Sequence, residues 1–131
     1  MAAHVVRLGS PRLPGEGLRL GTVRRPPRSV RKEDFARRDF YDVWLPELAP
    51  SAQLLSWVQH QPPGAQRWSR FEREYRREMS DPVPQRLIGL LAAMSTQGNF
   101  AVGCYCMDEA QCHRSVLRRL LAKAGAVLAD E

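Results

Sequence analysis

The residues of this 131-residue sequence that are best suited to chemistry gather in one short segment near its carboxyl end. This segment holds three thiols, an imidazole and a guanidinium: Cys104, Cys106, Cys112, His113 and Arg114. A thiol beside a helix N-terminus and an arginine can have a lowered pKa, which makes it a nucleophile. One hypothesis is therefore a cysteine-dependent enzyme with the catalytic residues Cys112, His113 and Arg114. Cys106 is the alternative nucleophile.

Other chemistry for the same segment stays open. If a metal binds, Cys106, Cys112 and His113 are its expected ligands, with Cys104 as a further thiol, but the paired knuckles typical of zinc sites are missing. Cys106 and Arg114 are too far apart for the cysteine–arginine loop of phosphatases, and the two nearest thiols are one residue short of a Cys-x-x-Cys centre. A purely structural role is the remaining alternative, and we expect it for Cys104, since buried cysteines behave as small hydrophobes.

A second group of useful residues lies in the first third of the chain, which holds eight basic residues and one acid in its first 32 positions. Arg24, Arg25 and Arg28 lie at the carboxyl end of a predicted strand, around a Pro-Pro break. Guanidinium groups suit bidentate recognition of phosphate. The function that the sequence favours is a phosphate or anion pocket at the strand-to-helix turn 106–114, built from these three arginines and Arg114. Its expected partner is a nucleotide or a nucleic-acid backbone.

Short strands and helices are expected to position both groups. Strands are predicted at residues 4–8, 18–24 and 100–106, and the last of these is apolar enough to be the central strand of a parallel sheet. Ligands of such sheets lie outside the carboxyl ends of the strands, beside helix N-termini. We therefore predict an α/β fold: one small domain over residues 1–131, with a short, mostly parallel sheet and helices packed on it.

The helices are predicted from apolar spacing and capping residues. Ser51 is expected to cap one helix, a second is amphipathic from residue 68 to 79, and a third, carrying Leu87 to Met94, is expected to be well buried. Asp108 is expected to cap the last helix. A third function class is an interaction module that uses an aromatic region formed by Trp44, Trp57 and Trp68.

Composition sets the protein class. The hydrophobic fraction is 44% and the charged fraction 26%, which is typical of a folded domain. No apolar run is long enough to span a membrane, and the N-terminus lacks the apolar stretch of a secretory signal. We expect a cytoplasmic protein with reduced thiols and no membrane partner. Cofactors and oligomeric state stay open.

Several stretches also carry a family resemblance: LRLGTVRRPPR at residues 18–28, YDVWLPELAPS at 41–51, Phe71 with Tyr75, and Cys112-His113-Arg114. They are similar to the early strand and basic turn, the Trp and Pro-Ser helix entry, the Phe-x-x-x-Tyr helix and the Cys-His-Arg string of the domain-of-unknown-function 488 (DUF488) family. The closest branch is the YeaO-like one, and the similar region covers residues 4–124, followed by a short C-terminal tail. The resemblance implies a compact intracellular α/β fold and carries over no reaction or cofactor. Thr22 and Arg24 stand where an Asp-Arg pair is usual, and Cys112 stands where the YeaO-like branch often has Asn.

Overall fold

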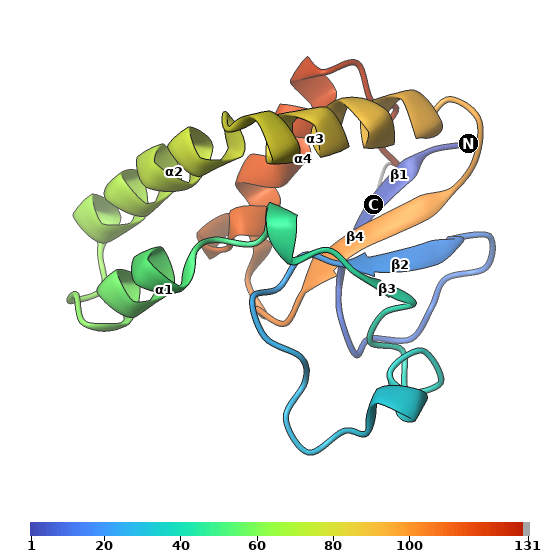
Figure 1. The fold of residues 1–131 in the computed structure, drawn as a ribbon, viewed down its shortest axis with the longest axis horizontal. Helices are drawn as coiled ribbons and strands as arrows, with labels where there is room; N and C mark the ends of the chain where they lie inside the picture. The colour runs from blue at the N-terminus through green and yellow to red at the C-terminus, as the bar shows by residue number, and fades with distance from the viewer. Residues whose placement is uncertain (130–131) are drawn as a thin grey trace.

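The computed structural model describes residues 1–129 and contains a four-stranded sheet whose neighbouring strands are all parallel (Figure 1). The spatial order is β1-β4-β2-β3. The strands are β1 (Ala3–Arg7), β2 (Leu18–Gly21), β3 (Val43–Trp44) and β4 (Phe100–Cys104). The prediction of a small α/β domain is confirmed, and β4 is a central strand, paired on both sides and buried along its whole length.

Helices cover one face of this sheet. They are α1 (Ala52–Gln59), α2 (Ala65–Met79), α3 (Pro82–Met94) and α4 (His113–Lys123), with 3-10 turns η1 (Lys32–Asp34), η2 (Pro46–Leu48) and η3 (Glu109–Gln111). The amphipathic pattern of α2 places Phe71, Tyr75 and Met79 in the main core, where the Tyr75 hydroxyl donates to the Leu48 carbonyl at 2.7 Å. This bond ties α2 to η2, next to the carboxyl ends of the strands.

The opposite face of the sheet is covered by the loop that contains η1, below the sheet in Figure 1. Alternate strand residues face the two layers: Val102 lies in the main core, whereas Ala101 packs in a smaller cluster with Tyr41 and the partly buried Phe35. A Cβ at Gly21 would lie 2.4 Å from the Tyr41 ring, so only glycine allows this packing. The strand end therefore has both faces covered, as its continuous apolar run indicates.

Two charges of the basic N-terminal third are buried rather than exposed. Arg19 and Glu16 are each 1% exposed and form an ion pair with a 2.6 Å Nε–Oε2 distance. Arg19 also donates to the carbonyls of Ser10, Pro11 and Asp39. This arginine holds the loops around β2 together and contributes nothing to a surface charge.

Two helix predictions need correction. The third helix is not well buried along its apolar residues, because Leu90 and Met94 are 55% and 44% exposed. The last helix does not begin at Asp108, whose carboxylate accepts from the Ala110 amide and so caps η3, while α4 begins at His113 with Cys112 as its N-cap residue. The Ser51 cap of α1 is confirmed by a 3.1 Å bond from the Leu54 amide to its hydroxyl.

The chain after α4 returns to the sheet. Ala3 donates to the Val127 carbonyl, and the Ala129 amide donates to the Ala3 carbonyl, so this segment lies along β1. The predicted C-terminal tail continues into residues 130–131, which lie outside the described residues. Among the described helices, none combines the length and apolarity that crossing a membrane requires.

Candidate functional site: a thiol cluster beneath an arginine-lined pocket

The two chemically rich segments meet at one pocket of about 830 Å³ outside the carboxyl ends of β2 and β4. One wall is the basic turn 23–28, the second is formed by Cys104, Cys106 and His113, and the third is a face of α1. This is the position at which parallel sheets bind ligands. The predicted location of the site is thus a real concavity, and α1 is a wall that sequence reasoning did not assign to it.

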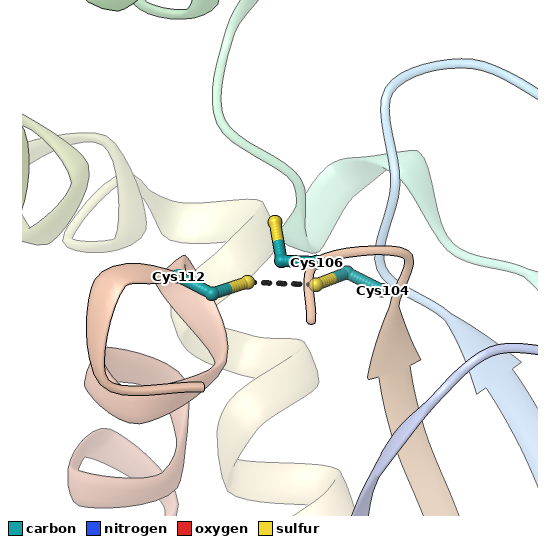
Figure 2. Close-up of side chains that lie close together, drawn as sticks. All are labelled: Cys104, Cys106 and Cys112. Atoms are coloured by element: carbon teal, nitrogen blue, oxygen red, sulfur yellow. Dashed lines mark hydrogen bonds between the residues drawn. The ribbon is translucent and has the colours of Figure 1, made fainter. Parts of the chain in front are cut away.

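Cys104, Cys106 and Cys112, called the thiol cluster below, lie with all three Sγ atoms within 4.8 Å of one another. Cys104 and Cys112 are each 2% exposed and their Sγ atoms are 2.7 Å apart, whereas Cys106 is exposed. Figure 2 shows Cys104 and Cys112 facing each other, with Cys106 on the loop beside them. The cluster forms because β4 ends at Cys104 and α4 starts just after Cys112, so the intervening turn folds back on itself.

His113 is the next group along α4, and its hydrogen bonds define its tautomer. Its Nε2 is 2.7 Å from the Thr22 carbonyl oxygen, which can only accept, so Nε2 carries the proton. Its Nδ1 is then an acceptor and lies 3.7 Å from Cys112 Sγ. Thr22, the residue directly after β2, therefore orients His113 to take a proton from the Cys112 thiol.

Arg114 lies behind the pocket and is not part of its lining. The side chain is 4% exposed, and its Nη2 donates to the Cys106 carbonyl at 2.6 Å. Its buried Nε has no hydrogen-bond partner among residues 1–129. Arg114 thus fixes the backbone that carries Cys106 and places a positive charge next to the thiols, while its predicted contact with a bound anion stays a prediction.

The surroundings of the thiol cluster favour a thiolate at its exposed position. The neighbouring Cys104 and Cys112 thiols lower the pKa of Cys106 to about 3, with burial opposing the effect and the Arg114 charge adding to it. Hydrogen bonding to the neighbouring sulfurs raises the pKa of Cys104 far above its ordinary value. The pKa of Cys112 is also lowered, chiefly by its hydrogen bond with Cys104, so of the two thiols with a lowered pKa only Cys106 is exposed.

The predicted anion-binding arginines differ in whether their guanidinium groups already have hydrogen-bond partners in the protein. Arg24 donates to the carbonyls of Pro46, Ala49 and Pro50, and so anchors the chain that leads into α1. Arg25 and Arg28 line the pocket and are exposed, and no hydrogen bond or ion pair of their side chains occurs within the described part of the chain. Arg25 and Arg28, called the arginine rim below, are the free cations of the pocket wall.

The cluster also has the donor types of a metal site. Three thiols and the His113 Nδ1 could surround a thiophilic ion, and the Nε2 bond to a carbonyl is a common second contact of a metal-bound histidine. However, two zinc-bound thiolates with Zn–S distances of about 2.3 Å lie about 3.7 Å apart, and the Cys104–Cys112 contact of 2.7 Å is shorter. The nearby Arg114 guanidinium also opposes a cation. The arrangement thus suits a free thiolate better than zinc.

Thr22 is a site residue whose role the sequence did not indicate. Its hydroxyl is 3.0 Å from the Gly103 carbonyl and 3.3 Å from His113 Nε2, and its carbonyl is the main partner of that imidazole. The departure from the usual Asp-Arg pair, at Thr22, is therefore in direct contact with the predicted catalytic histidine. The aromatic region is not one surface: Trp57 and Trp68 pack against the main core, and Trp44 is 42% exposed on β3.

Comparisons with known proteins agree with the resemblance seen in the sequence. The family model DUF488-N3a, described as the active DUF488-N3 subclade, matches residues 3–125. The chain is 32% identical over 68 residues to "Uncharacterized protein Mb3100c" of Mycobacterium bovis and to "Uncharacterized protein Rv3073c" of Mycobacterium tuberculosis. The matched region covers 52% of this chain and 52% of each relative, so the chain spans about half the length of the curated relatives it matches.

No solved structure matches the chain. The family match does not test the YeaO-like branch, which stays a prediction. Because the match extends over nearly all the described residues, the chain belongs to the DUF488 family, within the group described as the active DUF488-N3 subclade.

Proposed function

We propose that this protein is a cysteine-dependent enzyme that binds an anionic substrate, of the nucleotide or nucleic-acid-backbone class, and presents it to the Cys106 thiolate. The observation that carries the proposal is the composition of one pocket. An exposed cysteine of lowered pKa and two unpaired arginines line the same concavity. Anion recognition and a nucleophile are thus combined in one place.

The arginine rim supplies the binding energy for the substrate. Arg25 and Arg28 are exposed and carry no partner within the described chain, so their donors are available to phosphate oxygens. Their surroundings include Pro26 and Pro27, whose fixed backbone torsions limit how far the turn can move. The turn therefore restrains both arginines, while their guanidinium groups form no hydrogen bonds within the described chain.

The thiol cluster supplies the nucleophile. A thiolate is the reactive form of cysteine, and here two neighbouring thiols and Arg114 favour it at Cys106. The Arg114 bond to the Cys106 carbonyl orients the segment that bears the nucleophile. Arg114 is in this account a positioning residue, and His113 is the proton acceptor for the buried half of the cluster.

Protection from alkylation tests the proposal. Cys106 is alkylated with iodoacetamide in the presence of ADP or of a short single-stranded oligonucleotide, and peptide mapping follows the rate. We expect at least about tenfold protection by one of the two probes, and protection by the oligonucleotide should fall with salt because phosphate binding releases counterions.

Variants separate specific binding from general charge. Arg25→Ser with Arg28→Ser should abolish the protection, while Arg73→Ser, at an exposed position of α2 outside the pocket, should leave it intact. Absence of protection by both probes would contradict the anion-binding part of the proposal. Equal protection in all variants would contradict the role of the rim.

A further inference from the structure

We infer that the thiol cluster is an oxidation relay, in which Cys106 reduces a hydroperoxide and passes the oxidation to a buried disulfide between Cys104 and Cys112. This inference rests on the proposed function in one respect, the reactivity of Cys106, and it adds an activity that substrate binding does not require. The relay leaves Cys106 as a free thiolate at the end of each cycle.

The positions of the sulfur atoms carry the inference. Cys104 Sγ and Cys112 Sγ are 2.7 Å apart, so a bond of about 2.05 Å requires them to approach by only about 0.6 Å. Cys106 Sγ is within 4.8 Å of both. Among the described residues, the cluster drawn in Figure 2 joins one exposed cysteine to two cysteines that are each 2% exposed. A nucleophilic cysteine with nearby resolving thiols is the arrangement that two-electron thiol oxidation requires.

The first step uses the exposed thiolate. Cys106 Sγ attacks the distal oxygen of the hydroperoxide, the O–O bond breaks, and the alkoxide or hydroxide that leaves takes up a proton from water. Cys106 is then a sulfenic acid, oxidised by two electrons, and the hydroperoxide has become an alcohol or water.

The second step uses the dyad of Cys112 and His113. His113 Nδ1, 3.7 Å from Cys112 Sγ, accepts the thiol proton, and the resulting thiolate attacks the Cys106 sulfur. A Cys106–Cys112 disulfide forms, the S–O bond breaks, and the leaving hydroxide takes the proton from His113 to become water. The imidazole returns to its starting state, held by its Nε2 bond to Thr22.

The third step moves the disulfide inward. Cys104 is a poor nucleophile while hydrogen bonds to its neighbouring sulfurs hold its pKa high. After the first two steps those sulfurs form a neutral disulfide, so they no longer raise the pKa of Cys104. Its proton is released to solvent, its sulfur bonds to Cys112 Sγ, and Cys106 departs as the thiolate that its environment favours. In total, one hydroperoxide and two thiols yield one alcohol, one water and one disulfide.

The experiment maps disulfides in the full chain after treatment with one equivalent of hydrogen peroxide. The reaction is stopped with acid, free thiols are alkylated, and peptides are identified by mass spectrometry. We expect a Cys104–Cys112 disulfide with Cys106 alkylated. Replacing Cys106 with serine should slow formation of this disulfide at least about tenfold, because buried thiols react slowly with peroxide.

A trapping variant tests the order of the steps. Cys104→Ser should accumulate the Cys106–Cys112 disulfide, and far-ultraviolet circular dichroism verifies that the variant is folded. With one equivalent of peroxide and no reductant, Cys112→Ser should stop at the Cys106 sulfenic acid, which dimedone labels and peptide mapping locates. The wild-type disulfide map keeps the inference testable even if a buried variant fails to fold.

Three outcomes would overturn the relay. These are oxidation that stops at Cys106 without a disulfide, a Cys104–Cys112 disulfide that forms equally fast in Cys106→Ser, and stoichiometric zinc in the purified protein that blocks alkylation of all three thiols. If Cys106 is alkylated rapidly and a phosphate compound protects it, but no disulfide forms, the proposed function stands and the relay is wrong. If Cys106 reacts as slowly as an ordinary thiol, both are wrong.

Discussion

Arginine side chains on the two sides of the pocket differ in burial and in bonding. The arginine rim is exposed and free of internal bonds, whereas Arg114, behind the thiol cluster, is 4% exposed and bonded to the backbone. Substituting an exposed arginine costs little folding free energy, whereas substituting a buried arginine leaves its partners without their hydrogen bonds and charge. Under the proposed function, the rim would therefore select the ligand and the buried side would control the reactivity of the sulfur.

Among the substitutions that test this comparison, the largest expected effect on stability is at Arg114. Arg114→Gln removes the Nη2 bond to the Cys106 carbonyl and the positive charge beside the thiolate. We expect a loss of about 3 kcal/mol in the free energy of unfolding, measured with urea, and a higher pKa of Cys106. Arg119→Gln is the matched control on the same helix, because its side chain is 52% exposed, and it should change stability by less than about 0.5 kcal/mol. Equal losses in the two variants would contradict the account.

An intermediate effect is expected at Thr22. Thr22→Val keeps the shape and the carbonyl that holds His113, but removes the hydroxyl bonded to the Gly103 carbonyl. The Gly103 carbonyl still accepts from the Thr22 amide, so loss of the single hydroxyl bond should reduce the unfolding free energy by about 1 kcal/mol in urea titrations. Because the carbonyl bond persists, the imidazole should keep its tautomer, which nitrogen NMR of His113 can verify. A changed tautomer would show that the hydroxyl, rather than the carbonyl, orients the ring.

The smallest effect on folding is expected at the rim. Replacing Arg25 and Arg28 with serine should shift the unfolding free energy by no more than about 0.5 kcal/mol in urea, since neither side chain is bonded within the described chain. Arg24→Ser is the informative comparison, because it removes three bonds from the guanidinium to backbone carbonyls, and a loss of about 1–2 kcal/mol is expected. If all three positions behaved alike, the distinction between bound and free arginines would fail.

Local patterns were sufficient to predict the scaffold, and they directed the search for a site to the sheet edge where the structure has a pocket. The apolar run from Phe100 identified the central strand, and the Pro-Pro break placed the arginines at a strand end. Because the carboxyl ends of parallel strands meet at one edge, the basic turn and the turn before α4 had to lie close together. Helix α3 was misjudged because an apolar composition does not reveal that Leu90 and Met94 lie on the outer side.

The chemical state of each side chain depends on contacts that no local pattern contains. An arginine that binds carbonyls, such as Arg24, looks identical in sequence to a free one such as Arg28. Asp108 has the right type for a helix cap, but the chain makes a 3-10 turn first and leaves Cys112 at the start of α4. That shift places the Cys112 thiol against Cys104, a core residue as expected, and so creates the cluster.

The central claim, a resting thiolate at Cys106, is tested most directly by the pH dependence of its alkylation. The rate for Cys106 is measured by peptide mapping from about pH 5 to about pH 9, in the folded protein and in the same protein unfolded with urea. A thiol whose pKa is lowered to about 3 is already ionised across this range, so the rate should be nearly constant in the folded protein. In the unfolded chain it should rise with pH toward an ordinary cysteine pKa of about 8.5. Folded and unfolded profiles that rise together would contradict the account.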